Sequence, residues 1–371
     1  MRVIDADGHV EESQATFSDE YLDPAFRSQR PQPVGTEGLV YWMIDEQLFP
    51  RRVGRGCHNL GTPVSIDGRP ARHSAGKPDS PESMELSDIK ARLRAMDEEG
   101  IAVQVIYPTL FLAYPLTANP AFATALTSAY NRFIGDRLSG QDRLRWAAVV
   151  NLDDMPGAAR QVHEAKRLGA SAVMVLGTAG DRLLDDESLL PFYEAVAEEN
   201  LPLAVHVGWS CPPLSNLYTH IYPSGVSPFC APVLMGFASF ISGGLLDRYP
   251  NLRVAFLEAG SLWIHFMLDR LEHRFKNSLA KILPQLAPKS AHSPIEYVRR
   301  GNLYFSAEIE DALLPQVIDL VGEGQILFGS DMPHGDRERF AGRMLGERKD
   351  LSHSAKRSIL ESNPARFYGL S

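Results

Sequence analysis

The sequence predicts a (β/α)8 barrel of the TIM type, because short apolar runs alternate eight times with longer helical patterns. The runs are almost continuously apolar, as expected of parallel strands that are buried on both faces. Acidic and histidine side chains stand at the ends of several runs, and barrel enzymes carry their active sites at that end. An open, doubly wound sheet is the structural alternative. The sequence has no glycine-rich dinucleotide-binding turn to favour it.

The expected strands cover residues 2–7, 102–108, 144–151, 171–176, 201–206, 252–258, 302–306 and 325–330. The expected helices cover residues 87–99, 121–138, 156–168, 187–200, 231–249, 261–280, 311–321 and 352–361. In the first of these helices Ile89, Leu93 and Met96 recur near helical spacing, and Ser87 is the expected N-cap.

Two stretches exceed what a minimal barrel needs. Residues 10–86 are rich in Gly, Pro and Arg and contain one strand-like piece at 39–44, and residues 208–230 are rich in Pro, Ser and aromatic side chains. Both follow strands that end in candidate ligands, so we expect them to build the active-site face. A linker or disordered segment is an alternative over 51–82. We expect a single domain, 1–371, with 10–86 inserted after the first strand.

Composition excludes several classes of function. Among 371 residues, 44% are hydrophobic and 22% are charged, the net charge is −9, and no Lys/Arg-rich run suggests nucleic-acid binding. No apolar run approaches the roughly 20 residues of a membrane helix. The chain begins almost at once with a strand, so no signal peptide is expected. The three cysteines, Cys57, Cys211 and Cys230, fit no zinc knuckle. We expect a cytoplasmic protein that acts on a small molecule, with no nucleic-acid or membrane partner.

Side chains at the strand ends predict a metal site. Asp7 and His9 end the first strand, His206 the fifth, Glu258 the sixth, and Asp331 follows the eighth. Residues i and i+2 of a strand share a face, so Asp7 and His9 can bind one ion together. Alone, His206 could be a core histidine and Asp331 a helix N-cap. Their shared position favours a divalent cation bound by Asp7, His9, His206 and Asp331, with Zn²⁺, Mn²⁺ and Fe²⁺ as candidates.

Six segments resemble an amidohydrolase-related family that includes aminocarboxymuconate semialdehyde decarboxylase. They are DADGHVEE (5–12), AYNRF (129–133), HVG (206–208), FLEAGSLWIHFMLDRLE (256–272), FGSDMPH (328–334) and NPARFYGL (363–370). The resemblance spans almost the whole chain. It implies a metal-dependent enzyme, with zinc the first expectation and manganese or iron the alternatives, and a homodimer. Members of the family include decarboxylases, hydratases and hydrolases.

The resemblance also implies roles for individual residues. Asp7 and His9 are similar to the two ligands of the first strand, and His206 to the ligand of the fifth. Asp331 is similar to the aspartate of the eighth strand, which binds the metal and handles a proton.

The sixth strand departs from the decarboxylases of the family. These resemble one another in a His-Gly-Gly segment whose histidine is an acid or base, whereas this chain has Glu258, Ala259 and Gly260. Glu258 is therefore open to three interpretations: a general acid or base, a ligand for a second ion, or a structural carboxylate.

Large or polar side chains on the predicted rim loops are candidates for contact with the substrate. They are Trp42, His58, Trp209, His220, Tyr222 and Trp263. His334, three residues after Asp331, is expected to act in catalysis or to orient the substrate, and Glu12 to support the ligands. Arg55 lies in the same loop as His58. His265 falls inside a helical pattern, and Cys211 and Cys230 are expected to be packing residues.

The favoured function is hydrolysis of an amide, ester or thioester of a small organic acid. In this mechanism a metal-activated water attacks the carbonyl, Asp331 takes its proton, and Glu258 or His334 protonates the leaving group. The main alternative is non-oxidative decarboxylation of an aromatic or unsaturated acid. A catalytically silent metal-binding barrel is the third interpretation.

Overall fold

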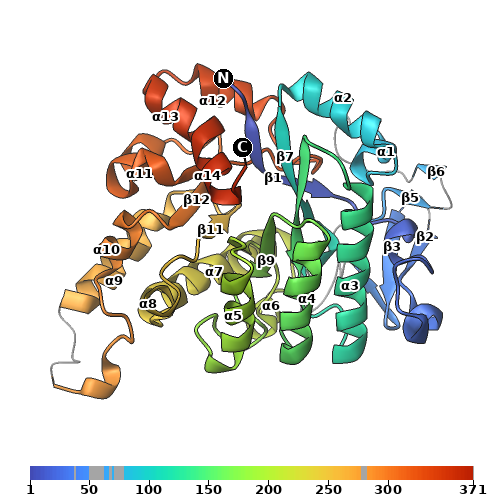
Figure 1. Ribbon diagram of the computed structural model, residues 1–371, viewed down its shortest axis with the longest axis horizontal. Coiled ribbons are helices and arrows are strands. Elements are labelled where there is room, and N and C mark those ends of the chain that lie inside the picture. Colours follow the sequence, from blue (N-terminus) through green and yellow to red (C-terminus); the bar gives the residue numbers. More distant parts are fainter. Residues whose placement is uncertain (37–38, 50–61, 67–68, 71–78, 277–281, 371) are drawn as a thin grey trace.

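The computed structural model describes residues 1–36, 39–49, 62–66, 69–70, 79–276 and 282–370. Eight parallel strands form one sheet in chain order, which confirms the expected fold class (Figure 1). They are β1 (Ile4–Val10), β7 (Val103–Pro108), β8 (Leu144–Val149), β9 (Ala172–Leu176), β10 (Leu203–His206), β11 (Val254–Leu257), β12 (Leu303–Ala307) and β13 (Ile326–Phe328).

The sheet closes on itself, which rules out the open doubly wound alternative. Gly8, in β1, forms a parallel bridge with Met332, just past β13. The Asp331 amide donates to the carbonyl of Asp7 at 2.9 Å, and the His9 amide donates to the carbonyl of Met332 at 2.6 Å. This closure brings the two chain segments that carry Asp7, His9 and Asp331 side by side.

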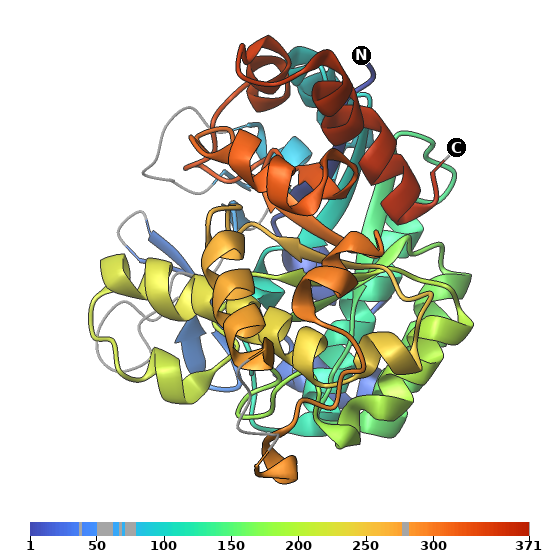
Figure 2. The ribbon, with the colours of Figure 1, turned by 90° about the vertical axis from the view of Figure 1, so that its left-hand side faces the viewer.

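Helices surround the barrel, as Figures 1 and 2 show from two sides. They are α1 (Pro81–Met84), α2 (Ile89–Glu99), α3 (Pro120–Arg137), α4 (Met155–Arg167), α5 (Leu190–Glu198), α6 (Pro212–Ser215), α7 (Ile221–Ser242), α8 (Leu245–Arg248), α9 (Trp263–Lys276), α10 (Pro294–Arg299), α11 (Leu314–Val321), α12 (Ala341–Glu347), α13 (His353–Arg357), a π-helical turn (Ser358–Ser362) and α14 (Asn363–Tyr368). The expected N-cap of α2 was wrong by one residue. Asp88, not Ser87, accepts a hydrogen bond from the amide of Lys90.

Helix α7 departs most from expectation. It begins at Ile221 and not at 231, and it continues through Pro228 and Pro232. Ser224 and both prolines are buried and stand four residues apart, so they share the packed face. Burial of that face offsets the two backbone donors that the prolines remove. By length and composition α7 could cross a membrane, contrary to expectation, but half of its apolar window is buried inside the protein, as in core helices.

The insertion after β1 carries a small sheet of its own. Strands β2 (Gln32–Thr36), β3 (Leu39–Ile44) and β4 (Gln47–Phe49) are antiparallel, which confirms the strand expected at 39–44. Two short strands, β5 (Ser65–Ile66) and β6 (Arg69–Pro70), pair beyond it. The alternative of a linker over 51–82 concerns residues that lie mostly outside the described ranges, as do Arg55, Cys57 and His58.

Candidate metal centre

Four side chains converge at the carboxyl end of the barrel. Asp7 and His9 come from β1, His206 ends β10, and Glu258 follows β11, and their ligand atoms all lie within 4.8 Å of one another. Oδ1 of Asp7 is 3.2 Å from Nε2 of His206 and 3.3 Å from Nε2 of His9. Oε2 of Glu258 is 3.4 Å and 3.6 Å from the same two nitrogens. One point is therefore faced by two imidazoles and two carboxylates.

Backbone carbonyls fix the orientation of both imidazoles. Nδ1 of His9 lies 3.0 Å from the carbonyl oxygen of Pro108, and Nδ1 of His206 lies 3.1 Å from that of Val207. A carbonyl oxygen can only accept, so each Nδ1 carries the proton and donates. In the neutral ring each Nε2 then presents a lone pair to the cluster, which is how metal-binding histidines are normally held.

Asp331 and His334 form a second group at the edge of the first. Nδ1 of His334 lies 2.5 Å from Oδ1 of Asp331, and that oxygen is 3.6 Å from Nε2 of His9. On its other side, Nε2 of His334 lies 3.0 Å from Oγ1 of Thr109 and 3.9 Å from Oε1 of Glu11. Asp331 thus touches both the ligand cluster and an imidazole that can carry a proton.

The donor set fits a divalent cation. Nε2 of His9 and Oε2 of Glu258 are buried and make no hydrogen bond. Buried polar atoms without a partner are costly, and a cation that both reach would satisfy them together. Nitrogen and carboxylate oxygen ligands suit Zn²⁺, Mn²⁺ and Fe²⁺ alike. Two groups of side chains among the described residues could each hold an ion: Asp7, His9, His206 and Glu258 form the first, and His9, Asp331 and His334 the second.

Excess negative charge governs the electrostatics of the centre. Burial alone would lower the pKa of His9, but the hydrogen bond and charge of Asp7 outweigh it and raise the pKa to about 9. Burial would raise the pKa of Asp7, and the charges of His206 and His9 instead hold it well below its usual range. Burial, reinforced by the charge of Asp331, raises the pKa of Glu258 well above 4.5. The cluster therefore attracts positive charge.

The backbone turns sharply at Glu258 and at Asp331. Glu258 has φ of +60° and Asp331 has φ of +54°, in the left-handed region that side chains other than glycine seldom adopt. The amide of Glu258 donates to Oγ of Ser306 at 2.7 Å, which ties the turn to β12. Conformations of this kind gather at functional sites, where the surrounding structure holds them.

A buried hydrogen-bond network, which was not predicted from the sequence, supports the backbone next to the metal-ligand candidates. The carboxylate of Asp5 accepts hydrogen bonds from the hydroxyl of Ser330 at 2.6 Å and from Nε2 of Gln104 at 2.6 Å. Nε of Arg92 donates to Oε1 of Gln104 at 2.8 Å, and its Nη2 donates to the carbonyl of His9 at 2.9 Å. The sequence did contain one sign of this network, because Asp5 stands two residues before Asp7 on the same strand.

Two acidic residues near the metal centre, Glu308 and Glu11, were not among the candidates predicted from the sequence. Glu308 follows β12, and burial together with the charge of Asp331 raises its pKa to about 8. Inspection of the seventh strand's end, as for the other strands, would have found it. Glu11 approaches His334 because β1 continues through Val10.

Cys230 was expected to be a packing residue. Burial and the charges of Glu258 and Glu308 raise the pKa of its thiol to about 11, which supports that assignment.

The three tryptophans proposed as substrate contacts are held by other protein groups. Trp42 is buried, with its ring edge-on to Phe17 at 5.7 Å, which favours a packing role. Nε1 of Trp209 donates to Oγ of Ser224 at 3.1 Å, and its side chain lines a cavity beside β4 and α6. Trp263 packs among three phenylalanines.

The remaining candidates lie at the surface or outside the described residues. His220 is the N-cap of α7 and accepts from the amide of Tyr222, and both side chains are exposed. His265 is exposed on α9 and lies 3.3 Å from the carbonyl of Gln316. His58 lies outside the described ranges. Contact of His58, His220 and Tyr222 with a substrate stays a prediction.

Comparisons with known proteins agree on one family. The family model described as amidohydrolase matches residues 4–370. A 2-amino-3-carboxymuconate-6-semialdehyde decarboxylase from Dictyostelium discoideum is 24% identical over 292 residues, which cover 76% of this chain and 77% of that protein. A 2-keto-4-carboxy-3-hexenedioate hydratase from a Sphingobium species is 24% identical over 329 residues, covering 80% and 89%.

Solved structures show the same fold. An amidohydrolase from Mycobacterium avium subsp. paratuberculosis superposes with a TM-score of 0.76 at 24% identity, covering 100% of this chain and 98% of that one. A 5-carboxyvanillate decarboxylase from Novosphingobium aromaticivorans, in complex with manganese, gives 0.66 at 19% identity and covers 75% and 79%. With a family match over nearly its full length, this chain belongs to the amidohydrolase family of metal-dependent barrel enzymes.

Proposed function

We propose that the protein is a divalent-metal-dependent decarboxylase of a small aromatic or unsaturated carboxylic acid. The observation that carries this proposal is the Asp331–His334 pair beside the ligand cluster, with its 2.5 Å contact. Decarboxylation needs a proton donor next to the ion, and Glu258 is occupied within the cluster itself. The decarboxylases from Dictyostelium and Novosphingobium support this choice of reaction over hydrolysis, which the sequence had favoured.

The bound cation would supply Lewis acidity that holds the carboxylate of the substrate. We assign its ligands as Asp7, His9, His206 and Glu258, with Asp331 at the edge. Manganese is the first metal to test, because the Novosphingobium enzyme binds it. Zinc, expected from the sequence, and iron are equally compatible with the donor atoms.

His334 is the proposed proton donor. Burial would lower its pKa, but the charge of Asp331 outweighs this effect and raises the pKa to about 9, so the ring is protonated near neutral pH. The hydroxyl of Thr109 gives its single proton to the carbonyl of Val10, at 2.9 Å, and therefore accepts from Nε2 of His334. This leaves the Nδ1 proton, shared with Asp331, for transfer. As the bond to the carboxylate breaks and carbon dioxide leaves, the electron pair on carbon takes that proton.

Addition of water is the second candidate. Glu258 stands where the decarboxylases of the family resemble one another in carrying a histidine, and a carboxylate suits the steering of water. The Sphingobium hydratase supports this alternative. Hydrolysis of an ester, amide or thioester falls under the same chemistry.

One experiment separates the candidates. The protein is loaded with Mn²⁺ or Zn²⁺ and offered hydroxybenzoic acids, unsaturated dicarboxylic acids, esters, amides and thioesters. Carbon dioxide release and acid production are followed separately. Metal-dependent carbon dioxide release that His334→Asn lowers is the expected result. Acid production or hydration without carbon dioxide release would overturn the decarboxylase assignment. Homodimerisation and a cytoplasmic location stay predictions, and gel filtration tests the first.

A further inference from the structure

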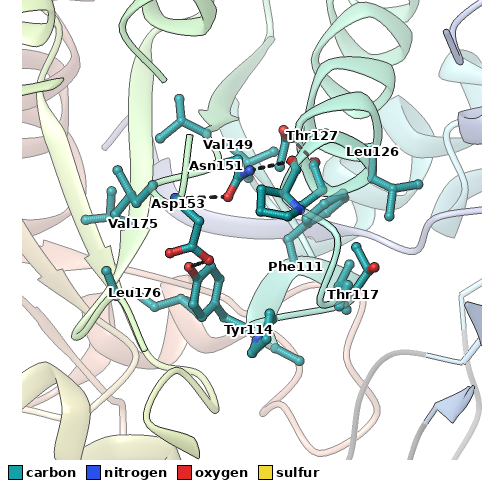
Figure 3. Close-up of a pocket in the computed structure, with 18 of the residues that line it drawn as sticks. Phe111, Tyr114, Thr117, Leu126, Thr127, Val149, Asn151, Asp153, Val175 and Leu176 are labelled. Carbon is teal, nitrogen blue, oxygen red and sulfur yellow. Dashed lines mark hydrogen bonds between the residues drawn. The ribbon is translucent and has the colours of Figure 1, made fainter. Parts of the chain in front are cut away.

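A pocket of about 850 Å³, including its opening to solvent, lies at the carboxyl end of the barrel. Its walls come from the loop after β7, from α3, and from the ends of β8 and β9. Figure 3 shows Leu176 and Val175 on one side, Leu126 and Thr127 on the opposite side, and Tyr114 between them. Mostly apolar walls with a few polar side chains are typical of small-molecule sites.

One wall of the pocket belongs to β9, the strand next to the one that carries His206. Leu176, in its wall, pairs in register with the metal-ligand candidate His206 on the adjacent strand. Neighbouring strands lie about 4.8 Å apart, so wall and ligand are one strand spacing from each other. The loop after β7 is also tied to the loop after β10. The amide of Trp209 donates to the carbonyl of Leu112 at 2.8 Å, and the amide of Tyr114 donates to the carbonyl of Trp209 at 3.1 Å.

Polar side chains in the wall already have protein partners. Nδ2 of Asn151 donates to the carbonyl of Pro120 at 2.9 Å and to Oγ1 of Thr124 at 3.0 Å. The carboxylate of Asp153 accepts from the hydroxyl of Tyr114 and, at 2.7 Å, from Nη2 of Arg182. A ligand here would gain from apolar burial and not from new ionic contacts. A second carboxylate on a substrate would meet Asp153.

We propose that this pocket binds the hydrocarbon part of the substrate, so that the enzyme acts on a carboxylic acid that carries an uncharged alkyl or aryl group. The acid end of the substrate lies at the metal centre and the apolar end enters the pocket past Leu176. This inference rests on the proposed function for the position of the acid group, whereas the apolar binding site itself does not depend on it.

Two substitutions should block the pocket. Ala123, on α3, lines it, and Ala123→Phe would fill it from a helical position. Ala118 is exposed at the rim of the same pocket, so Ala118→Trp should narrow the pocket without disturbing the packed core. The matched control is Ala121→Phe, because Ala121 is exposed on the same helix and outside the pocket lining. Circular dichroism and thermal melting establish that each variant folds.

The first measurement uses the uncharged fluorescent probe N-phenyl-1-naphthylamine with the metal-loaded protein. We expect saturable binding to the wild type and to Ala121→Phe, and a Kd at least tenfold higher in Ala123→Phe and Ala118→Trp. Equal binding to all four proteins, or no saturable binding to the wild type, would overturn the pocket assignment, whatever reaction the enzyme catalyses.

The second measurement uses 2-hydroxybenzoic acids with a 4-alkyl group that lengthens from methyl to butyl. In the wild type kcat/KM for carbon dioxide release should rise about fourfold per methylene, the gain expected from burying each group. The rise should vanish in the two blocked variants and persist in Ala121→Phe. A flat series in the wild type would overturn the role in substrate binding. No carbon dioxide release from any of these acids would count against the proposed function, and probe binding would then decide on the pocket alone.

Discussion

A Cβ atom at Gly329 would lie 2.7 Å from Cβ of Asp7, so the eighth strand approaches the first too closely for any larger residue. The same atom would lie 3.6 Å from Oδ2 and 3.7 Å from Cγ of Asp7, so the contact is made with the side chain of a metal-ligand candidate. Gly8, the neighbour of Asp7, has a similar constraint, since a Cβ there would lie 2.5 Å from the side chain of Gln104. Small residues thus set the position of Asp7 on two sides.

Gly329→Ala should therefore weaken metal binding without unfolding the barrel. The added methyl displaces Asp7, and a shift of a ligand by a few tenths of an ångström should cost about tenfold or more in metal affinity. Competitive chelator titration measures the affinity. The control is Gly346→Ala on α12, where the nearest atom would be 4.0 Å away and affinity should not change. Unchanged affinity in Gly329→Ala would show that Asp7 does not bind the ion.

His206→Ala should strip the ion while the fold is retained. His206 ends β10 at the mouth, and residues at this face serve function more than barrel stability. Elemental analysis should find about one divalent ion per chain in the wild type and little in the variant, with circular dichroism unchanged. His265→Ala, on exposed α9, is the matched control and should keep its metal. Full occupancy in His206→Ala would contradict the ligand set.

His334→Asn should separate proton transfer from metal binding. His334 contacts Asp331 and lies outside the four-residue ligand group, so metal content should persist. Loss of a general acid typically lowers turnover by about 10²-fold or more. Turnover and metal stoichiometry are measured on the same preparation, with His220→Asn at the exposed start of α7 as the control. Simultaneous loss of metal would identify His334 as a ligand.

Glu12 makes stability depend on pH in a direction that can be checked. Burial raises the pKa of Glu12 to about 8, although one of its oxygens accepts from the amide of Leu110 at 2.8 Å. The folded chain keeps a proton that the unfolded chain, with a pKa near 4.5, has lost. Stability from this group is therefore fully present below about pH 4.5 and is lost as pH rises to about 8.

Glu12→Gln removes that titration and keeps the acceptor for Leu110. The free energy of unfolding, from urea titrations at pH 5, 7 and 9, should fall less with pH in the variant than in the wild type. Between pH 5 and pH 9 the wild type should lose on the order of 2–5 kcal/mol more free energy of unfolding than the variant. Parallel pH profiles for the two proteins would mean that Glu12 stays ionised in the folded state.

Periodicity within the sequence was enough to predict the barrel. Eight apolar runs match eight strands, since burial on both faces of a parallel strand leaves a continuous apolar signature. The i, i+2 spacing was also enough to pair Asp7 with His9, because strand geometry places alternate residues on one face. Both properties are local, and a single segment encodes them.

Properties that depend on packing between distant segments were decided by the tertiary structure. Helix α7 extends through Pro228 and Pro232 because the barrel buries that face, a gain that local propensity does not record. Glu258 joins the ligand group because its left-handed backbone and Ser306 turn it inward. Besides Asp331, His334 contacts Thr109 and Glu11, which come from two other strand ends. Closure of the barrel brings these groups together. Their contacts join residues that are far apart in the sequence, so local patterns could not predict them.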